Sequence, residues 1–225
     1  MDVFEAVDSR IACRAFLDKP VDLNIVKDLI VKAQRAASGG NLQSWNVYAL
    51  TGAPLAEFKA IVKNRITNED PRHTKSEYPI YPDPMWGAYK ERREEHGVQL
   101  YGSLGIDQTD APKRLGQFKK NFEFFGAPVA LFITIDRRLG PGQWADLGGY
   151  IHALAFLARG YGLDTCPQEA WARLYDTVGE YLKLPDNEML FCAVAIGYGD
   201  RAHQANSFRA PRAAPEDFCR FFGFD

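Results

Sequence analysis

Hydrophobic residues recur along this chain with two different periods, and segments of the two kinds alternate. After Asp22, apolar residues three and four positions apart predict an amphipathic helix, which Asp22 caps and which ends near residue 37. A strand is predicted at 47–50, and Pro54 suits the first turn of another helix. The apolar positions of the first helix are Val26, Leu29, Ile30 and Ala33.

The second half of the chain continues the alternation with more strongly apolar segments. Asp110 begins a predicted helix in which four apolar side chains align: Leu115, Phe118, Phe122 and Phe125. The segment at 128–136 is apolar on both faces, which predicts a central strand. A buried helix at 145–163, a helix at 170–182 and a strand at 189–198 complete the pattern. This mixed order predicts an α+β fold without the regular βαβ units of a Rossmann sheet.

Two segments depart from this pattern. Residues from 63 to 108 form an excursion, which is polar, irregular and proline-bearing up to Trp86 and then highly charged and helical. The last residues, about 200–225, form a C-terminal arm with prolines, arginines and four phenylalanines. With no repeat and no low-complexity linker, we expect one domain over 1–225.

Composition and charge restrict the partners. The net charge of −2 gives no long-range attraction for polyanions, so neither nucleic acid nor a membrane surface is expected as a partner. The acidic N-terminus resembles no export signal, and no apolar run approaches the roughly 18 residues of a membrane span. The four cysteines are widely spaced, which favours free thiols in a reducing compartment and hence the cytoplasm.

Several common chemistries lack their motifs in this sequence. The four histidines are scattered, no CxxC pair occurs, and no metal site is therefore expected. GxSxG, GxxxxGK[ST] and GxGxxG are all absent. The alternating charges around Arg92 are typical of a solvated helix face.

Two pairs of arginines stand at opposite ends of the chain. Arg10 and Arg14 stand at the end of a short predicted N-terminal helix, and Arg209 and Arg212 lie in the C-terminal arm. Each pair alone is consistent with surface cations or a solvated tail. Together they are also suited to converge on one phosphate, because guanidinium groups bind its oxygens in pairs. Between them, the loop SGGNLQ offers backbone N–H groups and the amides of Asn41 and Gln43, which suit a polar heterocycle.

The combined motifs resemble the FMN-dependent nitroreductases. The family pattern RxSxRxF is matched at Arg10, Arg14 and Phe16, and APSxxNxQPW is matched by AASGGNLQSW. The resemblance continues through FGAP (125–128), DLGG, GLDTCPQEAW, AIGYGD and the final RxPR, in the family's order. The excursion is similar to that of nitrobenzoate and other nitroarene reductases. Ala12, Ala37 and Ser44 depart from the family's serine and two prolines, and the missing hydroxyl at 12 removes a hydrogen bond worth about 1 kcal/mol.

The resemblance implies a central, mainly antiparallel sheet flanked by helices, an intertwined homodimer, and FMN with NADPH or NADH as reductant. Arg10 and Arg14 would bind the phosphate and ribityl chain, and Arg209 and Arg212 would close the phosphate site. The loop SGGNLQ at 38–43 would reach the partner's flavin, and the backbone N–H of Glu169 would lie near flavin N5. The implied cofactor-binding residues are Arg10, Ile11, Ala12, Arg14, Ser38, Gly39, Asn41, Gln43, Pro167, Gln168, Glu169, Arg209 and Arg212.

The excursion is the expected acceptor site, since its aromatic residues are suited to stack on a planar substrate. We expect Tyr81, Trp86 and Tyr89 to contact the acceptor, and Arg93 or Arg92 to bind a substrate carboxylate. An alternative is that these aromatics only attach the excursion to the body of the dimer.

The expected activity is NAD(P)H-dependent reduction of a nitroaromatic or quinone-like acceptor by a ping-pong hydride-transfer cycle, with no catalytic side chain. Two alternatives stay open: another reaction on the same fold, such as reductive dehalogenation, and a dimer that binds flavin or another phosphate without turnover.

Overall fold

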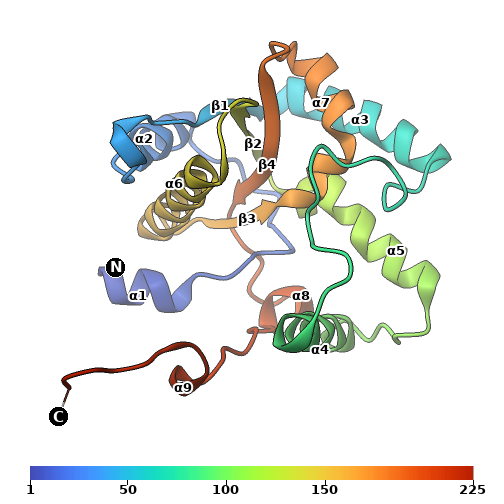
Figure 1. Ribbon diagram of the computed structural model, residues 1–225. Coiled ribbons are helices and arrows are strands. Elements are labelled where there is room, and N and C mark those ends of the chain that lie inside the picture. The colour runs from blue at the N-terminus through green and yellow to red at the C-terminus, as the bar shows by residue number, and fades with distance from the viewer. Residues whose placement is uncertain (225) are drawn as a thin grey trace.

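Strand β2 (Val129–Asp136) lies at the centre of the fold, and its first seven residues are buried. It pairs antiparallel with β1 (Asn46–Thr51) and β4 (Glu188–Gly197), and β3 (Asp164–Gln168) pairs antiparallel with β4. The resulting order is β1-β2-β4-β3 (Figure 1). The computed structural model describes residues 1–224. The predicted α+β class with a central antiparallel sheet is confirmed.

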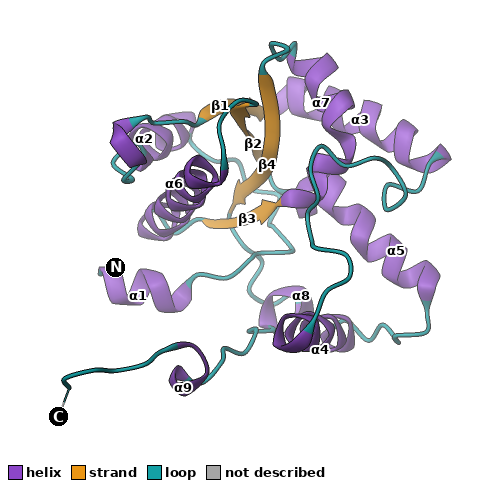
Figure 2. Ribbon diagram, viewed as in Figure 1, coloured by secondary structure: helices purple, strands orange, loops and turns teal. Residues whose placement is uncertain are grey.

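Helices cover both faces of this sheet (Figure 2). Side chains of β2 alternate between the two faces: Leu131 and Ile133 pack with α2 and α6, whereas Phe132 packs toward α3 and α7. The helices are α1 (Val3–Ser9), α2 (Leu23–Ala33), α3 (Gly52–Asn68), α4 (Gly87–Ser103), α5 (Ala111–Lys119), α6 (Pro141–Gly160), α7 (Tyr175–Leu182), α8 (Gln204–Ser207) and α9 (Pro215–Phe218). Three 3₁₀ turns are η1 (Gly39–Asn41), η2 (Lys120–Gly126) and η3 (Glu169–Leu174).

Strand β3 was not predicted, and its sequence explains why. The segment DTCPQ contains an aspartate and a proline, which are uncommon in strands, so its pattern does not predict a strand. Because β3 is an edge strand of the sheet, Pro167 is tolerated there. Asp164 is buried because the guanidinium groups of Arg159 and Arg201 pair with its carboxylate.

The predicted phenylalanine helix is shorter than its periodicity indicates. Helix α5 ends at Lys119, and the chain continues as η2, in which Phe124 and Phe125 have positive φ angles of 53° and 52°. This backbone turns the aromatic side chains into the core, where Phe124 stacks on Trp171 with ring centroids 4.6 Å apart. Core packing therefore overrides the helical period here. Helix α2 also ends early, at Ala33 rather than near residue 37.

Helix α4 lies apart from the sheet and contacts α8 (Figure 1). None of its residues is buried. The excursion is anchored instead by Tyr78, which is buried and stacks on Phe191 with ring centroids 5.8 Å apart. No helix within residues 1–224 is long and apolar enough to span a membrane. The same residues contain no cluster of three His, Cys, Asp or Glu side chains suited to a metal ion.

Candidate functional site

The N-terminal arginines lie on an extended segment beside the sheet. Helix α1 ends at Ser9, so Arg10 caps the helix and Arg14 lies beyond it, not at the end of the helix as the sequence indicated. Ala12 forms a parallel bridge with Thr165 of β3, and the backbone N–H of Cys13 donates to the Thr165 carbonyl at 2.9 Å. The arginine segment is thus attached to the strand that ends in the turn at 167–169.

One buried amide holds the two ends of the chain together. Asn206 accepts a hydrogen bond from the Arg14 backbone N–H at 2.7 Å. Its Nδ2 donates to the carbonyls of Ala15 at 2.8 Å and Asp200 at 2.7 Å. Asn206 is only 8% exposed, so these bonds are protected from water. Its contribution was not found from sequence, because nothing local distinguishes it from other tail residues.

The two arginine pairs line one cavity of about 390 Å³. Ile11 and Ala12 line it as well, together with Asp8. Within residues 1–224, none of the four guanidinium groups has a carboxylate partner within 4 Å. Burial, followed by the charges of Arg212 and Arg209, lowers the pKa of Arg10. Crowded cations without counter-charges form a donor set that fits a multiply charged anion such as a phosphate.

A histidine with no recognisable sequence motif lines the same cavity. His96 comes from α4, and its ring lies against Phe208 with centroids 5.4 Å apart. Burial, followed by the charges of Arg14 and Arg212, lowers its pKa. A lone histidine in a charged helix gave no sequence signal for this position.

The turn after β3 is the next element along the site. β3 ends at Gln168, and Glu169 begins η3. The first N–H groups of a helix have no partner within it, so the Glu169 N–H is suited to an external acceptor. Gln168 is 3% exposed, and its Nε2 donates to the Asn121 carbonyl at 2.8 Å. Pro167 is exposed at the sheet edge.

The loop at 38–43 lies elsewhere, against α6. The Gly39 N–H donates to the Asp146 carboxylate at 3.2 Å, and the Ser38 hydroxyl accepts from the Gln43 N–H at 3.1 Å. Gly40, Asn41 and Gln43 have positive φ angles of 58°, 58° and 48°, which explains the glycine and asparagine content of the loop. None of these residues lines the arginine cavity of its own chain.

The aromatic residues of the excursion fall into two groups. Tyr78 is a buried anchor, whereas Tyr81, Trp86 and Tyr89 are 52%, 61% and 61% exposed. Trp86 and Tyr89 meet edge to face at 5.8 Å and line a hollow of about 270 Å³ with Pro82 and Met85. The Arg93 guanidinium lies over the Tyr81 ring at 4.5 Å. Stacking leaves the in-plane N–H groups of Arg93 available to a carboxylate.

Comparison with known proteins gives one consistent family. The model of the "Nitroreductase family" matches residues 7–198. A 4-nitrobenzoate reductase of Pseudomonas putida is 38% identical, over 100% of this chain and 97% of its own, and a nitrobenzene nitroreductase of Ectopseudomonas oleovorans is 32% identical, over 96% and 95%. The crystal structure of the FMN and NADPH-dependent nitroreductase NfnB from sphigopyxis sp. strain HMH superimposes with a TM-score of 0.95 at 38% identity, over 100% of both chains.

Proposed function

The chain belongs to the nitroreductase family, and we propose that it is an FMN-dependent oxidoreductase that uses NADPH to reduce nitroaromatic compounds. Full-length similarity to a 4-nitrobenzoate reductase and to an FMN and NADPH-dependent nitroreductase supports this reaction. The two alternatives weighed on the sequence, reductive dehalogenation and flavin binding without turnover, have no observation in their favour.

The observation that carries the proposal is the cavity in which Arg10, Arg14, Arg209 and Arg212 meet. These guanidinium groups would hold the FMN phosphate, and the backbone of Ile11 and Ala12 would lie along the ribityl chain. Ala12 lines the cavity and is also bridged to Thr165 of β3, the strand that leads into the turn at 167–169. The backbone N–H of Glu169 would then donate toward flavin N5, with Pro167 and Gln168 shaping the same turn.

FMN, when bound, supplies the atom that accepts hydride from NADPH and passes it to the acceptor. The residues of this chain bind and orient it, and no side chain is needed as a nucleophile. Cationic and N–H donors fixed in place before binding stabilise negative charge without reorganisation. The acceptor would stack on Tyr81, Trp86 and Tyr89, with Arg93 binding a carboxylate when the acceptor has one.

A homodimer would complete the site. Ser38, Gly39, Asn41 and Gln43 lie outside the cavity of their own chain, which is consistent with a contribution to the partner's flavin site. Phe218, Phe221, Phe222 and Phe224 are 63% to 86% exposed in the single chain, an apolar surface that a partner subunit would cover. The four free cysteines fit a reducing compartment, so we place the enzyme in the cytoplasm.

A single spectroscopic titration tests this function. Purified protein should show the absorption spectrum of bound flavin and should bleach anaerobically on addition of NADPH. Its colour should return when 4-nitrobenzoate is added, and the moles of flavin reoxidised per mole of 4-nitrobenzoate give the number of electrons transferred. Protein that binds no flavin would contradict the cofactor assignment. Protein that bleaches but does not reoxidise with nitroarenes would contradict the choice of acceptor.

A further inference from the structure

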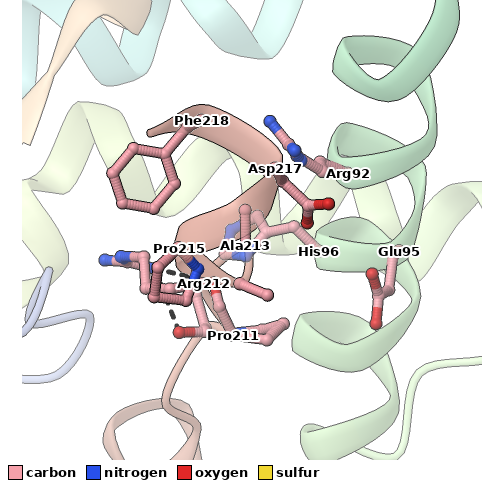
Figure 3. A pocket seen from close by; sticks show the side chains of 11 residues that line it. Arg92, Glu95, His96, Pro211, Arg212, Ala213, Pro215, Asp217 and Phe218 are labelled. Carbon is pink, nitrogen blue, oxygen red and sulfur yellow. Dashed lines mark hydrogen bonds between the residues drawn. The ribbon is translucent and has the colours of Figure 1, made fainter. Parts of the chain in front are cut away.

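The cavity of the four arginines contains one more group suited to a phosphate. His96 of α4 lines it together with residues of the N-terminal segment and of the arm. Figure 3 shows its side chain projecting from α4 toward the segment that carries Arg212 and Ala213. His96 also lines a second hollow of about 880 Å³ between α4 and the arm.

The ring nitrogens of His96 have no partner in the part of the chain that the structure describes. No hydrogen bond or ion pair within residues 1–224 involves them, although the side chain is half-buried and its ring is held against Phe208. An imidazole with a fixed ring and unpaired nitrogens is prepared to bind a ligand in the cavity. Cations dominate its surroundings. The charged groups around it are Arg92 and Glu95 on α4, Asp8 at α1, Arg10 and Arg14 on the N-terminal segment, and Arg209, Arg212 and Asp217 on the arm.

We propose that His96 is a fifth ligand of the cofactor phosphate and that it takes up a proton from solvent when the phosphate binds. The inference rests on the proposed function, since it assumes that FMN occupies this cavity. In the free protein, burial and the charges of Arg14 and Arg212 lower the pKa of the imidazole and so favour its neutral form. A dianionic phosphate reverses the local field, so the imidazolium forms and donates a charge-assisted hydrogen bond.

The sign of the pH dependence follows from this order of events. The pKa of His96 is lowered in the free protein, by burial and by Arg14 and Arg212, and it rises when the phosphate binds. The added affinity is therefore complete below the pKa of the free protein and is lost as pH rises through the pKa of the complex. The advantage of wild type over a variant without the imidazole, measured as the ratio of their Kd values for FMN, should thus be greatest at acid pH.

Titration of the flavin-free protein with FMN and with riboflavin, followed by quenching of flavin fluorescence at pH 6.0, 7.0 and 8.5, tests the proposal. His96→Gln should weaken FMN binding about 10-fold or more at pH 6.0 and less than about threefold at pH 8.5, the scale expected for a hydrogen bond to a charged group. Riboflavin, which has no phosphate, should bind both proteins with Kd values within about twofold of each other. Titration of the FMN phosphate itself affects wild type and variant alike, so the ratio of their Kd values isolates the imidazole.

Two further variants keep the test decisive. His96→Lys supplies a permanent cation and should retain most of the FMN affinity while losing the pH dependence of the ratio. His73→Gln changes an exposed histidine away from the cavity and should match wild type throughout. Calorimetry in buffers of different ionisation enthalpy should show proton uptake by wild type that His96→Gln lacks.

Unchanged FMN affinity of His96→Gln at all three pH values would overturn the inference and leave the proposed function intact. An equal loss for FMN and riboflavin would also overturn it, because that result indicates a purely structural role. Failure of wild-type protein to bind FMN at all would instead refute the proposed function.

Discussion

At the scale of the residue, the proposed phosphate site depends on cations that have no carboxylate partner within residues 1–224. Burial, followed by the charges of Arg212 and Arg209, lowers the pKa of Arg10, and a bound anion would relieve the repulsion between these cations. Each arginine of the cavity should therefore contribute more to binding the phosphate than to the stability of the fold.

Arg14→Ala tests this division. The substitution should raise the Kd for FMN roughly 10- to 150-fold, corresponding to about 1.5 to 3 kcal/mol for a hydrogen bond to a charged group. Arg114→Ala is a matched control, because its guanidinium donates to the Gln108 carbonyl at 2.8 Å outside the cavity. Equilibrium dialysis and fluorescence titration measure the Kd of each variant for FMN. Equal affinity of Arg14→Ala and wild type would remove Arg14 from the phosphate site.

Arg93→Gln tests carboxylate recognition. We expect the KM for 4-nitrobenzoate to rise about 3- to 10-fold, a modest change because the side chain is exposed and its charge is screened by water. The KM for nitrobenzene, which has no carboxylate, should change less than about twofold. Similar changes for both substrates would assign Arg93 a structural role at Tyr81.

At the scale of the element, success and failure of the sequence predictions have physical causes. β2 was predicted because residues apolar on both faces fit only a central strand. β3 was missed because an edge strand tolerates Pro167 and because the buried charge of Asp164 is compensated by Arg159 of α6 and by Arg201, which follows β4. His96 was missed because α4 looks like a solvated helix until its tertiary position is known. The arginine pairs were recognised from spacing and family motifs, but only the fold brings them together.

Trp86→Ala tests the role of the excursion as an acceptor site. Removing one stacking contact should raise the KM for a nitroarene about 2- to 12-fold, from about 0.5 to 1.5 kcal/mol. FMN content should not change, and stopped-flow reduction of the flavin by NADPH should stay within about threefold of wild type. An unchanged KM, or a loss confined to dimer stability, would leave Trp86 as part of the scaffold.

Two glycine substitutions test how strongly α4 and the sheet are constrained. A Cβ at Gly97 in α4 meets no atom within 4 Å, so Gly97→Ala should stabilise the helix by up to about 1 kcal/mol. Amide hydrogen exchange in α4 should slow by up to about fivefold as a result. At Gly197 a Cβ would lie 2.7 Å from Pro128 Cδ and 3.0 Å from Phe16, so Gly197→Ala should cost about 1 to 3 kcal/mol in urea unfolding. A Gly97→Ala variant that is destabilised, or a Gly197→Ala variant that is stabilised, would contradict the surroundings described for that glycine.

At the scale of the whole molecule, the exposed surfaces indicate an incomplete unit. The phenylalanines of the arm add to exposed apolar residues on α1, including Val3, Phe4 and Val7. A monomer rarely leaves so large an apolar surface uncovered.

Light scattering of the FMN-bound protein should therefore give about twice the chain mass of 25.3 kDa. The double substitution Phe218→Ser/Phe222→Ser should shift the protein toward monomer and release FMN as the subunits separate, since the neighbouring chain would supply the loop at 38–43. A wild-type monomer that retains FMN would contradict both the dimer and the shared site.

Helix α4 also has an evolutionary consequence. Tyr89 and His96 are seven residues apart, so they lie about 10 Å apart along the axis and within about 20° of each other around it. In the proposed enzyme, this one helix would fix the distance between the phosphate end of the cofactor and the place where the acceptor binds. An insertion or deletion of one residue between Tyr89 and His96 would rotate one of these side chains by about 100° around the helix axis relative to the other, so the two would no longer be aligned. New acceptors are therefore more accessible through substitutions along this face than through insertions or deletions within it.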